Sequence, residues 1–152
     1  ARRCATPWAR RRPNRAASEV LVAHGVRGAT DVTGFGLLGH AGEMARASGA
    51  RFVIDASALP ALEGALEAAR AGVETDGAAH NRRSVADLLE VAAEIEPARL
   101  ALAFDPQTSG GLLAAVPDDQ LDAVARALAA AAVDLWPVGR VEEGHGLAVT
   151  GS

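Results

Sequence analysis

The sequence contains no lysine, and all 15 of its basic residues are arginines. A reaction that needs a lysine ammonium group on a phosphate must therefore take that group from another polypeptide segment. Cys4 is the only cysteine, so an internal disulfide is excluded and a reducing, cytoplasmic location is expected. No apolar run approaches the roughly 18 residues that a membrane span needs. The four histidines are too scattered to suggest a zinc cluster: His24, His40, His80 and His145.

A natural start is also missing. The chain opens with Ala1, and its only methionine is Met44, so we expect a piece of a longer protein. Its 152 residues fit one domain, and 49% hydrophobic residues exclude a disordered chain.

The charge is uneven. Residues 1–15 hold six arginines and no acid, which gives +6, whereas the other 9 basic and 19 acidic residues leave −10. An acidic body argues against nucleic-acid binding, which needs a basic face. The basic start is typical of a transit peptide or a nucleic-acid arm. Pro7 and Pro13 and the lack of an apolar period favour a poorly ordered tail or linker at residues 1–13, followed by one domain at 14–152.

Apolar periodicity predicts helices that alternate with strands. The pattern is typical of an α/β (α+β) domain with a mixed sheet covered by helices. The last two strands are expected to meet across the turn Glu142–His145. The predicted helices are 14–24, 37–48, 60–71, 85–95 and 118–132, the last capped by Asp118, and the predicted strands are 51–55, 112–116, 135–141 and 146–150.

The segment Thr30–His40 is the most informative stretch. Gly34 and Gly36 let the backbone turn tightly just before a helix, and the N-terminus of a helix suits an anion such as phosphate. Asp31 would repel that phosphate by about 4 kcal/mol at roughly 4 Å unless a cation lay between them. Mg²⁺ binds carboxylate and phosphate oxygens together, so Asp31 is a candidate magnesium ligand. Thr33, Gly34 and Gly36 are candidate phosphate-loop residues.

Two other interpretations use the same residues. Asp31 or Thr33 could simply cap the helix, with the glycines only turning the chain. Gly34–Gly39 also matches G-x-G-x-x-G, with Asp55 about 20 residues on, as in a dinucleotide-binding fingerprint. The polar stretch before Gly34 and the uncompensated charge of Asp31 argue against the fingerprint.

Two long motifs resemble one family. Asp31-Val32-Thr33-Gly34-Phe35-Gly36-Leu37-Leu38-Gly39-His40 and Asp105-Pro106-Gln107-Thr108-Ser109-Gly110-Gly111-Leu112-Leu113 are similar, in this order, to signatures of the C-terminal domain of selenophosphate synthetases. The resemblance covers residues 14–150. One motif alone would also fit other members of the aminoimidazole ribonucleotide synthetase superfamily, such as thiamine-monophosphate kinase.

The resemblance implies a fold and an activity. The fold would be that of the superfamily's C-terminal domain, and the full enzyme would make selenophosphate, AMP and phosphate from selenide, ATP and water. A missing N-terminal half would supply the reactive cysteine or selenocysteine, the lysine, most metal and ATP ligands, and the homodimer contact. Asp31 would join the Mg²⁺ cluster, and no catalytic residue would lie in this chain, which alone would be inactive.

Other residues carry weaker expectations. Residues 1–13 do not resemble the family's linker, so Cys4 there is expected to be incidental. Asn81 is a weak site candidate, His40 is expected to be packed or capping, and loop 105–111 is expected to be structural. The remaining alternatives are another ATP-using member of the superfamily and a non-catalytic binding module.

Overall fold

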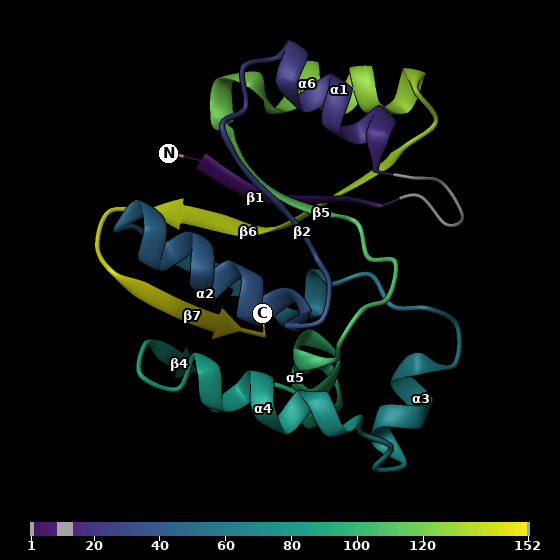
Figure 1. Ribbon diagram of the computed structural model, residues 1–152, viewed down its shortest axis with the longest axis vertical. Helices are drawn as coiled ribbons and strands as arrows, with labels where there is room; N and C mark the ends of the chain where they lie inside the picture. Colours follow the sequence, from purple (N-terminus) through teal and green to yellow (C-terminus); the bar gives the residue numbers. More distant parts are fainter. Residues whose placement is uncertain (1, 9–13, 152) are drawn as a thin grey trace.

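A computed structural model describes residues 2–8 and 14–151. Within these ranges the chain forms one seven-stranded sheet flanked by helices (Figure 1). The strands are β1 (Arg2–Trp8), β2 (Gly28–Asp31), β3 (Arg51–Asp55), β4 (Leu89–Val91), β5 (Leu112–Pro117), β6 (Asp134–Glu142) and β7 (Gly146–Thr150). The helices are α1 (Arg15–Ala23), α2 (Gly36–Ser48), α3 (Ala65–Arg70), α4 (Asp76–Ser84), α5 (Pro97–Phe104) and α6 (Leu121–Ala130).

The sheet is mixed, as predicted. Its order is β2-β5-β1-β6-β3-β7-β4. The pairings from β2 across to β3 are antiparallel, and β7 pairs in parallel with both β3 and β4. Both faces are covered, because successive side chains of β5 enter different cores. Leu113 lies in the core that includes residues of α2, α4 and α5, whereas Leu112 and Ala114 lie in the core with α1 and α6.

The N-terminal segment differs from the predicted disordered tail. Arg2–Trp8 form β1, which lies between β5 and β6 and pairs antiparallel with both. Cys4 and Ala5 are fully buried there. Two of the arginines on which the prediction of a poorly ordered tail was based, Arg2 and Arg3, begin this strand, and Arg3 forms an ion pair with Asp118 at 3.1 Å. Residues 9–13, which hold three further arginines, lie outside the described residues.

Six predicted elements match the structure closely. They are the helices at 14–24 and 37–48 and the strands at 51–55, 112–116, 135–141 and 146–150. Gly49 ends α2 in the left-handed conformation (φ +62°), as its place after the last apolar residue predicts.

The middle of the chain corrects two predicted helices. The helix expected at 60–71 begins only at Ala65, because Gly64 is left-handed (φ +79°) and residues 59–62 line a pocket instead. The helix expected at 85–95 is wrong. A turn is followed by β4, whose parallel pairing with β7 outweighs helical periodicity. Helices α4 and α5 were not predicted.

The C-terminal part corrects two further expectations. Strands β6 and β7 do not pair across the turn, because β3 lies between them. Asp118 begins a short 3-10 turn (Asp118–Gln120), and α6 starts after it without a side-chain cap. None of the helices in residues 2–8 and 14–151 is long and apolar enough to cross a membrane.

Candidate functional site

The first motif forms a sharp connection from β2 to α2. β2 ends at Asp31, and α2 begins at Gly36, whose φ is +66°. The Gly36 amide donates to the Thr33 carbonyl at 3.0 Å, which closes the turn. A Cβ on Gly36 would lie 2.8 Å from the carbonyl carbon and oxygen of Phe104. Only glycine fits this position, since backbone angle and space both exclude a side chain.

The start of α2 has no side-chain cap. Its N-cap residue is Phe35, and no side chain accepts a hydrogen bond there. Neither Asp31 nor Thr33 therefore caps the helix, which contradicts that interpretation of the motif. The first-turn amides beyond Gly36 have no acceptor in the helix itself, because these positions precede the first intrahelical bond. This end of α2 is suited to an anion.

Asp31 lies at the open end of β2, opposite Leu112 of β5, and is exposed. In the described part of the chain its carboxylate has no hydrogen-bond or ion-pair partner. No group of three or more His, Cys, Asp or Glu residues gathers into a possible metal site among these residues. One free carboxylate fits a single ligand of a shared cation site and does not make a complete site.

The second motif packs directly on the first. The Gln107 amide donates to the Thr33 carbonyl at 3.0 Å, and the Val32 amide donates to the Gly111 carbonyl at 2.9 Å. A Cβ on Gly110 would collide with the Val32 carbonyl oxygen. The two motifs, about 70 residues apart in the sequence, therefore form one hydrogen-bonded unit. This contact supports the expected structural role of loop 105–111.

Asn81 joins both motifs to the helices behind them. It is 1% exposed, and its Nδ2 donates to the carbonyl oxygens of Gly34 and Phe104, both at 3.0 Å. Sequence reasoning treated Asn81 only as a weak site candidate. Its position within a predicted loop hid the fact that it lies on the inner side of α4, where a buried amide must be hydrogen-bonded.

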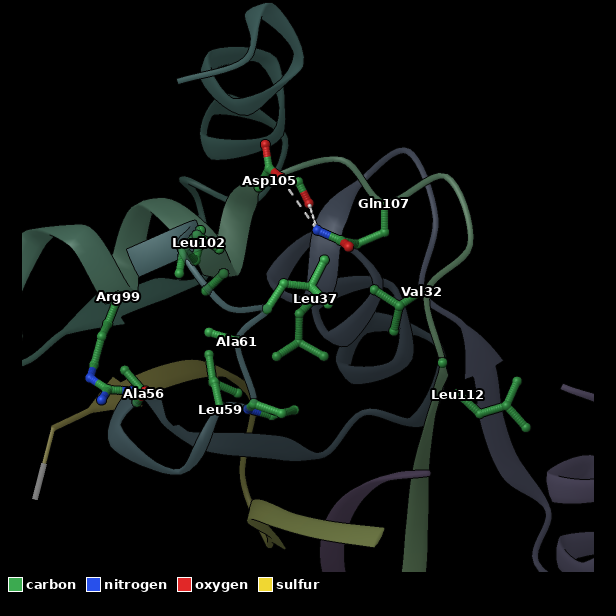
Figure 2. Close-up of a pocket in the computed structure, with 16 residues that line it drawn as sticks. Val32, Leu37, Ala56, Leu59, Ala61, Arg99, Leu102, Asp105, Gln107 and Leu112 are labelled. Atoms are coloured by element: carbon green, nitrogen blue, oxygen red, sulfur yellow. Dashed lines mark hydrogen bonds between the residues drawn. The ribbon is translucent and has the colours of Figure 1, made fainter. Parts of the chain in front are cut away.

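Asp105 and Gln107 orient each other at the edge of the second motif. Thr75 donates to Asp105 Oδ1 at 2.9 Å, and Gln107 Nε2 lies 3.2 Å from the Asp105 carbonyl oxygen. Figure 2 shows both side chains at one end of a pocket, with Arg99 at another end and Leu37 and Leu59 between them.

The pocket has a volume of about 170 Å³. It lies between the two motifs, α5 and the segment at 56–65. The NH1 group of Arg99 donates hydrogen bonds to the carbonyl oxygens of Ala56 and Ser57, at 3.3 and 3.2 Å. These bonds fix the part of the pocket wall that Ala56 forms. Sequence reasoning missed this pocket, because segment 56–65 was expected to be largely helical.

The topology excludes the dinucleotide-binding alternative. That fingerprint needs the strands before and after the glycine-rich helix to belong to one compact βαβ unit. Here β2 and β3 are separated by β5, β1 and β6. Asp55 Oδ1 instead accepts from the amide and hydroxyl of Ser57, at 2.9 and 2.7 Å. The acidic residue that should hold a ribose therefore starts a 3-10 turn (Ala56–Ala58).

Comparison with known proteins gives consistent results. Residues 4–152 match the family described as "AIR synthase related protein, C-terminal domain". The chain is 44% identical over 134 residues to a selenide, water dikinase of Nitratidesulfovibrio vulgaris (strain Miyazaki F), covering 88% of this chain and 38% of the relative. It is 42% identical over 115 residues to a selenide, water dikinase of Caldanaerobacter subterraneus, covering 76% and 33%. The chain thus spans about a third of the length of these relatives.

Solved structures agree on the fold. The PurL protein of T. maritima complexed with ADP superposes with a TM-score of 0.65 at 11% identity, over 99% of this chain and 23% of that protein. A thiamine-monophosphate kinase from Stenotrophomonas maltophilia gives 0.59 at 16% identity, over 99% and 50%. The matched family, the relatives and the fold lead to one conclusion: the chain belongs to the AIR synthase related proteins, as their C-terminal domain.

Proposed function

We propose that this chain is the C-terminal domain of a selenophosphate synthetase, which makes selenophosphate, AMP and phosphate from selenide, ATP and water. The observation that carries the proposal is the hydrogen-bonded unit of the two motifs, which leaves the free Asp31 carboxylate beside the uncapped start of α2. Relatives named selenide, water dikinase share 39–45% identity with this chain, which favours the selenium enzyme over other members of the superfamily.

Asp31 fits a role in holding Mg²⁺. It is an exposed carboxylate with no partner among the described residues, and it offers the hard oxygen ligands that Mg²⁺ prefers. When bound, Mg²⁺ supplies positive charge that offsets the ATP phosphates. The amides at the start of α2, with the turn Thr33-Gly34-Phe35-Gly36, would bind a phosphate group from the other side.

The remaining machinery must lie in a missing N-terminal half. This chain has no lysine, and its one cysteine is buried in the middle of the sheet, so neither a phosphate-binding ammonium nor an accessible thiol is available in it. The N-terminal half would also supply most of the residues that contact ATP, and it would form the homodimer contact. The full enzyme would be cytoplasmic. A non-catalytic binding module is the alternative from another class.

The test compares two proteins. The full-length enzyme should release AMP from ATP only when selenide and Mg²⁺ are both present. The present chain alone should show no ATP turnover above a blank without protein. AMP release that does not depend on selenide would contradict the proposed substrate, and turnover that copurifies with the isolated chain would contradict the division of the site between two halves.

A further inference from the structure

One wall of the pocket is formed by a segment that is weakly attached to the rest of the domain. Residues 57–77 contain no buried residue, and α3 lies in their middle. Gly64 and Gly72 stand on either side of this six-residue helix in the left-handed conformation, with φ +79° and +81°. In Figure 1, α3 lies at the periphery of the molecule, away from the sheet. A short helix with few buried contacts opens more readily than the core of a fold.

The same segment closes the pocket beside the two motifs. Leu62 and Ala65 contribute to the pocket lining, as do Val32 of the first motif and Gln107 of the second. Leu62 is also 49% exposed, so it separates the pocket from the solvent. A movement of α3 therefore changes the access to a pocket that both motifs share.

Two ion pairs hold this segment, and both meet at Glu96. Arg70, at the end of α3, donates from Nε to Glu96 Oε1 at 2.7 Å, and Arg99 Nε lies 3.5 Å from Glu96 Oε2. The NH1 group of Arg99 in turn donates to the carbonyl oxygens of Ala56 and Ser57, where the segment begins. Glu96 therefore connects both parts of the segment to the start of α5.

Glu96 is well placed but not strongly bound. It is the N-cap residue of α5, and Pro97 follows it at the first position of the helix, so its backbone is fixed. The hydrogen bond from Arg70 lowers the pKa of the Glu96 carboxyl, which is therefore charged at neutral pH. All three side chains of the ion pairs are partly exposed. Water and salt weaken such pairs, so they favour one position of a segment without locking it.

We propose that residues 60–72 form a strap over the pocket, and that Glu96 is the latch that holds the strap closed. When Arg70 leaves Glu96, α3 moves away from α5 with Gly64 and Gly72 as hinges, and the pocket wall beside the two motifs opens. Access to the pocket then depends on one ion pair, and so on ionic strength. The latch belongs to this chain alone and does not depend on the reaction proposed above.

The first experiment measures amide hydrogen exchange of this chain by mass spectrometry. Peptides from residues 62–73 should exchange faster than peptides from α6, and Glu96→Ala should accelerate their exchange about two- to fivefold. Glu19→Ala is the matched control, because it removes an exposed ion pair with Arg15, at 2.8 Å, on α1. It should leave the exchange of the strap unchanged.

Salt distinguishes an ionic latch from general loosening. Raising NaCl from about 0.05 M to about 1 M should accelerate the exchange of residues 62–73 in the parent and in Glu19→Ala, but not in Glu96→Ala. Equal exchange of these residues in the parent and in Glu96→Ala, or an equal response of both to salt, would overturn the latch.

The second experiment measures access to the pocket itself. Ala103 lines the pocket and is 2% exposed, so Ala103→Cys places a thiol in its wall. The thiol is labelled with 5,5′-dithiobis(2-nitrobenzoate), and the parent, whose only cysteine is the buried Cys4, gives the background. Adding Glu96→Ala should raise the labelling rate about two- to fivefold, in step with the exchange of the strap.

Two further points make the labelling decisive. Circular dichroism checks that Ala103→Cys is folded, and Leu102→Cys on the same wall replaces it if it is not. A labelling rate that Glu96→Ala leaves unchanged, while the exchange of residues 62–73 rises, would show that the strap moves without opening the pocket and would overturn the proposal. These outcomes are independent of whether the full-length protein makes selenophosphate.

Discussion

Gly34 and Gly36 differ in what a methyl group would meet at each position. A residue with a Cβ at position 36 would have to adopt the left-handed backbone conformation (φ +66°), and its Cβ would press on the Phe104 carbonyl group. At Gly34 an added Cβ would meet nothing within 4 Å. We expect Gly36→Ala to lower the free energy of unfolding by about 2 kcal/mol or more. Gly34→Ala, its matched control, should stay within about 0.5 kcal/mol. Urea denaturation measures both, and equal losses would show that the turn is less constrained than described.

Asp31 gives a second prediction at this scale. Asp31→Asn keeps the shape of the side chain but removes the charge proposed to hold Mg²⁺. In the full-length enzyme we expect a loss of selenide-dependent AMP formation worth several kcal/mol in transition-state stabilisation. Circular dichroism and the melting temperature should remain near those of the parent, because the carboxylate has no partner in the described residues. Parent-like activity with the same Mg²⁺ dependence would refute the metal role.

The role of a single residue could be predicted where it depends on the residues next to it in the sequence. Gly36 was identified because a glycine before a helix has a conformational reason visible in the sequence. The hydrogen bond from Asn81 to Gly34 joins residues 47 positions apart in the sequence, and the one from Gln107 to Thr33 joins residues more than 70 positions apart. No local pattern encodes such contacts, since they depend on how α4 and the second motif fold onto α2.

Strand β1 was hidden from sequence reasoning by its composition. Arginines and a proline suggested an exposed tail, yet a strand between two others gains both its hydrogen-bonding partners from distant segments. Strand β4 was missed for a related reason, because Leu89–Val91 is short and only its pairing with β7 makes it a strand. By contrast, β3 and β5 have buried, continuous apolar centres and were predicted within a residue of their observed ends.

The burial of Cys4 in β1 has a consequence for pH dependence. Desolvation raises the pKa of the Cys4 thiol from 9.0 to about 12. The folded state therefore holds this proton more tightly than the unfolded state. The resulting stability is fully present below about pH 9 and is lost as the pH rises toward about 12. At pH 10 we expect a loss of about 1 kcal/mol relative to pH 8.

The Cys4→Ala variant is the control for this effect. It removes the thiol while leaving a small apolar side chain in the strand, so the Cys4-dependent part of the loss should vanish. Urea denaturation of both proteins at pH 8 and pH 10 gives the comparison. If parent and variant lose equal stability between these pH values, Cys4 is not shielded in solution and β1 is not seated as described.

At the scale of the whole molecule, the two cores share the central strands of one sheet. Leu113 and Leu128 are each fully buried, the first in the core that contains α2 and the second in the core that contains α6. We expect Leu113→Ala and Leu128→Ala each to lower the unfolding free energy by about 2–5 kcal/mol. Each should shift one common transition seen by far-UV circular dichroism and by tryptophan fluorescence. Separate transitions would show that the two helix layers unfold independently.

The general architecture followed from the sequence, because alternation of helical and strand patterns indicates a layered domain whatever the strand order. The order itself did not follow. The turn at 142–145 suggested a hairpin between the strands on either side of it, but β3 occupies the place between them. Pairing with a distant strand replaces a hairpin between sequence neighbours when the distant strand buries more apolar surface. Phe52, Val53 and Ile54 of β3 are all buried.

The position of β1 between β5 and β6 also has a consequence for the nascent chain during its synthesis. Arg2 pairs with Pro117 on one side and with Val141 on the other. During synthesis β1 therefore has neither partner until β5, which begins at Leu112, has been made. At about 5–20 residues per second this delay lasts roughly 5 to 20 seconds, during which the strand presents two open edges. Arg2 and Arg3 would oppose the pairing of one such exposed strand with another copy, because their like charges repel.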